Sequence, residues 1–170
     1  MSLAEDPEKL GYWRYFLLLE AELENILRFI APDPRNRDTF SIEIARQVLS
    51  VCAQFEVIAR LLAGPGAERA HTLQDVYKIL IPNATGLNSW GVTFLPRNER
   101  VFPFTDWGPG STPAWWTAYN AIKHRPFARP ENASLRNLIP ALGGLGLLTT
   151  RYLRHETGTW LPRLFDLNYG

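Results

Sequence analysis

Apolar side chains recur at helical spacing in two long segments near the start of the chain, and this feature constrains the fold most. The first segment lies between Pro7, which can occupy the first turn of a helix, and Pro32, which ends one. The second begins at the candidate cap Ser41 and stops at Gly64. The apolar positions are Trp13, Phe16, Leu19, Leu23, Leu27 and Ile30, then Ala45, Val48, Leu49, Cys52, Phe55, Ala59 and Leu62. With a short polar connector between them, these patterns predict two antiparallel amphipathic helices.

Further helices are expected in the rest of the chain. Thr72, with Asp75 three residues later, can open a short helix over residues 72–81. The pair Thr112-Pro113 is a typical helix start and predicts a helix that runs to about Arg125. Another is expected from about residue 130 to about residue 155.

An aromatic-rich stretch over residues 90–107 interrupts the helical patterns. Residues 92–95 and 100–104 could form two strands around Arg97-Asn98-Glu99, with Pro103 limiting the second strand to an edge. The expected fold is mainly α, a single domain over residues 1–170. It is a bundle of about four to five helices with a small irregular or β-hairpin insertion near residues 90–107.

Composition excludes several classes of protein. The chain has 170 residues, 46% of them hydrophobic and 21% charged, as is ordinary for a globular domain that folds without a cofactor. A formal net charge of +1 argues against nucleic-acid binding by bulk charge, although a local basic patch stays open. The single cysteine, Cys52, excludes an intrachain disulfide and a cysteine-rich zinc site.

The expected location in the cell follows from two features: the start of the chain and its longest apolar stretch. The first nine residues include Glu5, Asp6 and Glu8 and no apolar run, so no secretory signal is expected. Pro140 and three glycines interrupt the longest apolar stretch, residues 138–148, so it should be a buried helix that bends or closely approaches a neighbour. A cytoplasmic protein without a membrane partner is therefore expected.

The segment from Trp115 to Arg125 carries the residues best suited to function. On a helix, Trp115, Tyr119 and Ile122 share one face, and Asn120 and His124 lie one turn apart on the other. Trp116 and Lys123 flank that pair, and Arg125 and Arg129 follow. An amide, an imidazole and several cations would suit a phosphate or a nucleotide, with the Trp116 indole as a stacking face.

Structural roles are the alternative for the same residues. His124 could cap the helix C-terminus, and Asn120 could bond to a neighbouring backbone. Glu56 lies on the apolar stripe of the second helix and needs a cationic partner, with Lys123, His124 and Arg125 as candidates. Glu20 and Glu24 also lie beside an apolar stripe. No metal site is expected, because a carboxylate-bridged centre needs paired Glu-x-x-His motifs and the chain has one such run, Glu68 to His71, in a glycine-proline loop.

One segment resembles a known superfamily. The run Tyr119-Asn120-Ala121-Ile122-Lys123-His124-Arg125, then Phe127, Asn132-Ala133 and Arg151-Tyr152-Leu153, looks like the C-terminal half of prokaryotic HEPN proteins. Residues 41–62, with Glu56 near their centre, fit the earlier half, and residues 85–110 lie outside the resemblance. It implies a helical bundle that forms a homodimer. Active members are metal-independent ribonucleases, often in toxin–antitoxin or defence systems, where the partner is a cognate antitoxin.

The family signature, an arginine followed after four to six residues by a histidine, carries over only in part. Its histidine would be His124, but its arginine would fall at Thr117, Ala118 or Tyr119. Asn120 cannot supply the missing positive charge for a scissile phosphate. We therefore expect an RNA- or nucleotide-binding protein without full ribonuclease activity. The alternatives are a structural or partner-binding bundle and a metal-independent ribonuclease that uses His124.

Overall fold

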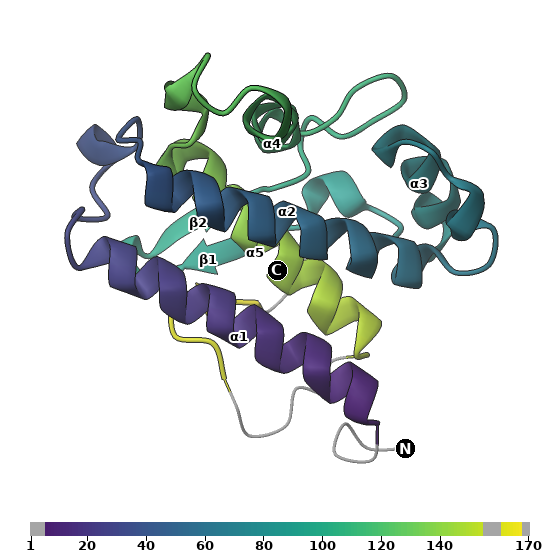
Figure 1. Cartoon of the computed structure of the whole chain (residues 1–170). Helices are drawn as coiled ribbons and strands as arrows, with labels where there is room; N and C mark the ends of the chain where they lie inside the picture. Colours follow the sequence, from purple (N-terminus) through teal and green to yellow (C-terminus); the bar gives the residue numbers. More distant parts are fainter. Residues whose placement is uncertain (1–5, 155–160, 168–170) are drawn as a thin grey trace.

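A computed structural model describes residues 6–154 and 161–167, and helices form most of this part of the chain. The α-helices are α1 (Pro7–Leu27), α2 (Ile42–Ala63), α3 (Leu73–Leu80), α4 (Ala114–His124) and α5 (Leu135–Tyr152). Figure 1 shows α1 and α2 running antiparallel, with α5 crossing behind α2 and α4 at the upper edge. The buried apolar side chains form a continuous core between these helices. The prediction of a mainly helical bundle with a small insertion is confirmed.

Helix starts follow the local sequence at most of the expected positions. Pro7 occupies the first turn of α1, the Ser41 hydroxyl accepts the backbone N–H of Ile44 at 3.1 Å, and Thr72 and Asp75 cap each other's backbone at the start of α3. Thr112 does not cap α4, contrary to the sequence expectation. Pro113 is extended, with ψ of 144°, so the helix begins one residue later and has no side-chain cap.

Two helix ends also differ from the prediction. The 3-10 turn η7 (Pro130–Asn132) precedes α5, which begins at Leu135 because Ser134 is still extended. Helix α5 ends at Tyr152, and His155, expected near its end, lies outside the described residues. None of the helices in the described part of the chain is long and apolar enough to cross a bilayer.

The insertion contributes two strands to a three-stranded antiparallel sheet with the order β2-β1-β3. Strands β1 (Val92–Phe94) and β2 (Glu99–Val101) make the predicted hairpin, and Asn98 turns the chain with φ of +49°. The second strand is shorter than expected and ends before Pro103. Strand β3 (Phe165–Asp166), which no sequence pattern indicated, pairs with β1 on its other side.

Glycines in α5 bring this sheet close to the helix, as one of the two sequence alternatives predicted. A Cβ added at Gly143 would lie 2.8 Å from Val92, and one at Gly146 would lie 2.9 Å from Phe16 of α1. Even a methyl group would therefore collide with a neighbouring element at either position. Helix α5 is continuous through Pro140 and packs against α2, α1 and β1.

The segment that contains β3 is fixed by a buried carboxylate of α1. Glu20 is 3% exposed, and its two oxygens accept the backbone N–H groups of Arg163, Leu164 and Phe165 at 2.8 to 3.2 Å. Glu24, one turn later, accepts from the Arg163 guanidinium at 3.0 Å. These two glutamates, which the sequence placed beside the apolar stripe, hold the last strand against the first helix.

Candidate nucleic-acid interface

Helix α4 is oriented by aromatic side chains that pack against α2. Trp115 meets Phe55 edge to face, with ring centroids 4.8 Å apart, and its indole N–H donates to the carbonyl of Pro103 at 2.8 Å. Tyr119 and Ile122 continue the same buried face, as the sequence predicted. The pKa of the Tyr119 phenol is raised, chiefly by its burial. This packing fixes which side of α4 remains open to solvent.

Trp116 does not offer the open stacking face that the sequence suggested. Its side chain is 7% exposed, and its ring lies 4.8 Å from that of Tyr119 and 6.1 Å from that of Phe55. The buried arc of α4 is wide enough to include both tryptophans, because the 102–107 segment and α2 cover it from two sides. The assignment of Trp116 as a ligand contact is therefore wrong, and this residue belongs to the core.

The polar residues at the end of α4 remain accessible. His124 and Lys123 are exposed and Asn120 is partly buried. Within residues 6–154 and 161–167, neither His124 nor Lys123 pairs with a carboxylate, and the Lys123 ammonium lies 5.7 Å over the ring of Tyr119. A purely structural role for Asn120 and His124 would require hydrogen bonds that join them to buried partners such as Glu56. The described residues form no such network, because Glu56 bonds to Arg60.

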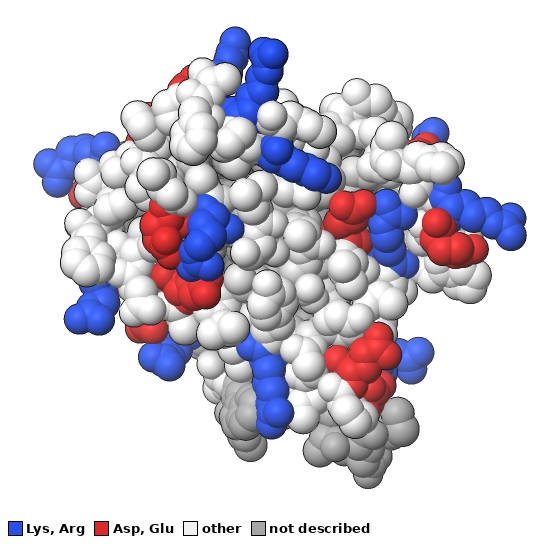
Figure 2. All heavy atoms as spheres, in the orientation of Figure 1, with Lys and Arg blue, Asp and Glu red and all other residues white. Residues whose placement is uncertain are grey.

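The loop after α4 brings two further cations to the same place. The backbone N–H of Arg125 donates to the carbonyl of Ala121 at the end of α4. In the loop, the carbonyls of Arg125 and Arg129 accept the N–H groups of Ala128 and Asn132, each at 3.1 Å. Both arginines are exposed and form no ion pair with any carboxylate that the structure describes, including the exposed Glu131 in the same loop. In Figure 2 cationic side chains project from the upper edge of the molecule, where this loop lies.

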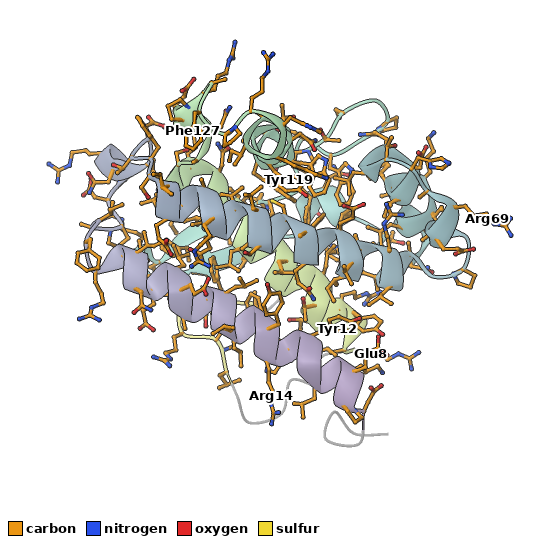
Figure 3. The ribbon with its side chains drawn as sticks, viewed as in Figure 1. Glu8, Tyr12, Arg14, Arg69, Tyr119 and Phe127 are labelled. Carbon is orange, nitrogen blue, oxygen red and sulfur yellow. The ribbon has the colours of Figure 1, made fainter. Side chains whose placement is uncertain are left out.

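Phe127 is the aromatic residue that sequence reasoning did not single out as a contact. It is 82% exposed and projects from the loop at the upper left of the molecule (Figure 3). A signal for it exists in the sequence, because Phe127 stands between Pro126 and Pro130 and so has no helical face on which to be buried. Phe127 lines one groove together with the exposed Phe40 and Ile42, and a contiguous exposed apolar surface often marks an interaction site.

A groove of about 400 Å³ runs beneath Phe127, between this loop and the start of α2. Its walls are mainly apolar and come from Phe40, Ile42, Ala45 and Leu49 on one side and Ile122, Pro126 and Ala133 on the other. Phe40 is 50% and Ile42 is 79% exposed. The cations Lys123, Arg125 and Arg129 thus lie on segments that border an apolar surface.

Glu56 has a different partner from those predicted. Its carboxylate accepts from the Arg60 guanidinium at 2.6 Å, within the same helix, and not from Lys123, His124 or Arg125. Arg60 also donates to the carbonyls of Ala67 and Ala70 at 2.8 Å, so the pair fixes the turn after α2. The prediction of a cationic partner for Glu56 is confirmed, but the predicted link from Glu56 to the segment of α4 is wrong. Spacing of four residues on one helix was enough to satisfy the carboxylate.

Other candidate groups do not form a second site with α4. Cys52 is fully buried, and burial raises the pKa of its thiol well above the usual value, as suits a small core residue. Across the described ranges, no three His, Cys, Asp or Glu side chains come together in a way that could hold a metal ion. The chemistry available at the end of α4 is therefore attraction of anions, hydrogen bonding by an amide and an imidazole, and stacking on Phe127.

Comparison with known proteins adds no functional information. No family model, curated protein or solved structure matches the chain. The resemblance to HEPN proteins therefore stays a prediction that depends on residues 41–62, 119–133 and 151–153.

Proposed function

We propose that this protein binds single-stranded nucleic acid, with RNA as the favoured form, at the end of α4 and the loop that follows it. One observation carries the proposal: the cations Lys123, Arg125 and Arg129 are exposed beside Phe127 and have no carboxylate partner among the residues described. His124 is exposed at the same place. Cations without partners attract backbone phosphates, and an exposed aromatic ring can stack on a base whatever its identity.

The surroundings of this cluster support a single strand over a duplex. A base already free of a partner can lie on Phe127 or enter the apolar groove beneath it, whereas paired bases are stacked on one another. Asn120 lies one turn before His124 and could bond to a sugar or a base edge. Recognition would thus combine a few phosphate contacts with one or two stacked bases.

Binding, and not cleavage, is the activity we propose. The positions where a ribonuclease of the resembling family carries its arginine hold Thr117, Ala118 and Tyr119, and Tyr119 is buried. Asn120 is uncharged and cannot stabilise a developing phosphate charge as an arginine does. His124 is left to contact the strand, and any hydrolysis it supports would be slow and independent of metal.

The test is fluorescence anisotropy with a labelled oligouridylate of about ten nucleotides, with oligothymidylate as the DNA arm. Three or four phosphate contacts give a slope of roughly −2 to −3 in log K against log salt for a single strand. Phe127→Ala and the double variant Arg125→Gln/Arg129→Gln should each weaken binding by about tenfold or more, and His124→Ala should weaken it with little change in melting temperature. Stacking is worth about 1–3 kcal/mol for each base.

Arg35→Gln is the matched control, because Arg35 is also exposed but pairs with Asp33 at 2.8 Å in the connector between α1 and α2. Equal affinity of the wild type, Phe127→Ala and the double arginine variant would exclude the proposal. In that case the apolar groove would favour the alternative function, the docking of a protein partner such as a cognate antitoxin or a second copy of this chain.

A further inference from the structure

A second hollow, of about 530 Å³, lies at the far end of α2 from the α4 loop. Its walls come from the start of α1 (Lys9), the end of α2 (Leu61 and Leu62), the 3-10 turn η4 (Ile81–Asn83) and the end of α5 (Arg151, Tyr152), with Arg154 just beyond. Figure 1 shows the end of α5 beside the start of α1 on the lower right of the molecule. Segments from the beginning, middle and end of the chain therefore line one open hollow.

Positive charge dominates the polar groups of this hollow. Three of its lining residues, Lys9, Arg151 and Arg154, are cations from two helices and the turn after α5. Among residues 6–154 and 161–167, no carboxylate lines the hollow. Lys9 is shared with Asp6, whose carboxylate lies 3.9 Å away. In the part of the chain that the structure covers, Arg151 and Arg154 have no such ion pair.

The nearest acidic side chains at the start of α1 are already engaged. Glu8 accepts the hydroxyl of Tyr12 at 3.0 Å, and Asp6 caps α1 through the N–H of Lys9. Figure 3 labels Glu8 and Tyr12 at this end of the molecule. These carboxylates reduce the local field, but neither pairs with the two arginines at the end of α5.

Arg151 is exposed and lies beside an aromatic ring. Its guanidinium carbon lies 5.9 Å from the ring centre of Trp90. Contact with an aromatic face occupies the flat side of a guanidinium and leaves the N–H groups at its edge available. An edge with several donors fits the oxygens of a phosphate in bidentate fashion.

Arg154 occupies a backbone conformation that glycine usually takes. Arg154 follows Leu153, the C-cap residue of α5. Its own φ is +52°, and its N–H donates to the carbonyl of Arg151 at 3.1 Å. A left-handed residue at this position is commonly glycine, because any Cβ is strained there. An arginine with this backbone conformation is less stable than a glycine would be, but it places a guanidinium on the wall of the hollow.

We propose that this hollow binds a small phosphate-bearing anion, whose phosphates are held by Arg151, Arg154 and Lys9. The volume lies in the range of sites for small molecules. Leu61, Leu62 and Tyr152 form an apolar wall on which the non-phosphate part of a nucleotide can lie. The shared chemistry is that of a polyphosphate chain, either inorganic or attached to a nucleoside.

Calorimetric titration at low ionic strength tests the site with three probes: pyrophosphate, inorganic triphosphate and ATP. Saturable binding at one site is expected for the wild type, with at least tenfold weaker binding by Arg151→Gln and by Arg154→Gly. The control Arg35→Gln removes the same charge from the opposite end of α1 and should bind within about twofold of the wild type. ATP binding more tightly than triphosphate would identify a nucleotide, and equal binding would identify the phosphates alone as the recognised group.

Thermal melts keep the test independent of folding. Arg154→Gly should melt at or above the wild-type temperature, because glycine relieves the left-handed backbone, so its loss of binding cannot come from unfolding. If this variant unfolds, Arg154→Gln takes its place and must lose binding in the same way. No saturable binding by the wild type, unchanged affinity of Arg154→Gly, or an equal loss in Arg35→Gln would overturn the proposal.

The two proposed sites can fail separately. Arg125→Gln/Arg129→Gln alters the α4 loop and leaves the hollow intact, so this variant should bind triphosphate as the wild type does. Arg151→Gln should in turn retain its affinity for oligouridylate.

Discussion

The Glu20 carboxylate accepts the backbone N–H of Leu164 at 2.8 Å, across 144 positions of the chain. The same carboxylate also accepts from Arg163 and Phe165, so three backbone donors converge on two oxygens. A carboxylate can accept all three, whereas an amide of the same shape has one acceptor oxygen and a donor nitrogen.

Glu20→Gln should therefore destabilise the protein although it removes a buried charge. We expect a loss of about 1–3 kcal/mol in the free energy of unfolding, as for a buried donor left without its acceptor. Chemical denaturation followed by circular dichroism measures this loss. Glu24→Gln, which affects only an exposed ion pair with Arg163, is the control and should change stability by less than about 1 kcal/mol. Equal effects of the two substitutions would contradict the anchoring role of Glu20.

Stability should also depend on pH through Glu20. Burial, the largest cause, raises its pKa in the folded state above the usual value of 4.5, and the three backbone hydrogen bonds only partly oppose this. The folded protein then holds the proton more tightly than the unfolded chain, so this stabilisation is present below the unfolded pKa and is lost as pH rises through the raised one. Glu20→Gln cannot titrate at this position, so the wild type should lose stability relative to the variant as pH rises through the raised pKa. Parallel profiles over that range would contradict the raised pKa.

Gly146 allows α5 to lie against Phe16 and Leu167, where an added Cβ would come within 2.9 Å of each side chain. Gly146→Ala should lower stability by about 1–3 kcal/mol, because overpacking outweighs the gain in helix propensity. Gly11→Ala in α1 is the matched control: nothing lies within 4 Å of the new Cβ, so stability should rise by about 0.5–1 kcal/mol. Opposite signs in thermal melts are expected, and stabilisation by both substitutions would show that α5 can shift without cost.

Trp115 connects α4 to the rest of the core. Trp115→Ala removes its contact with Phe55 and leaves the carbonyl of Pro103 without the indole donor, so we expect a loss of about 3–5 kcal/mol. Thr117→Ala on the exposed side of the same helix should change stability by less than about 0.5 kcal/mol. Denaturant midpoints compare the two variants, and similar midpoints would mean that α4 contributes little to the core.

Periodicity and capping predicted the helices because both are local properties. The structure confirms the apolar stripes of α1 and α2 and the caps Ser41 and Thr72. Each of these features depends only on neighbours within one or two helical turns. Strand β3 could not be predicted in the same way. It consists of two residues, and its pairing depends on Glu20 and β1, which are far away in the chain.

The sequence predicted which residue types lie at the candidate site better than it predicted which of them are exposed. The cations after Ile122 lie in the last turn of α4 and in the loop that follows it, and they were found from the sequence. The buried arc of this helix, however, is wider than one stripe and includes Trp116. Phe127 supplies the exposed ring instead. The partner of Glu56 was missed because only cations near another helix, Lys123, His124 and Arg125, were considered. Arg60 lies one turn away on the same helix. A helical wheel shows which residues share a face and does not show how much of that face is covered.

Strand β3 also has a consequence for the order in which the protein can fold during synthesis. Residues 163–166 leave the ribosome after every element that they bind: β1, which lies between β2 and β3, and the Glu20 carboxylate of α1. Until they emerge, β1 presents one open edge and Glu20 lacks its three backbone donors, even if the five helices have already met. Open strand edges are where nascent chains pair wrongly. The bundle therefore reaches its native form only when the last strand closes it, and a ribosome that stalls before residue 163 would hold an aggregation-prone intermediate.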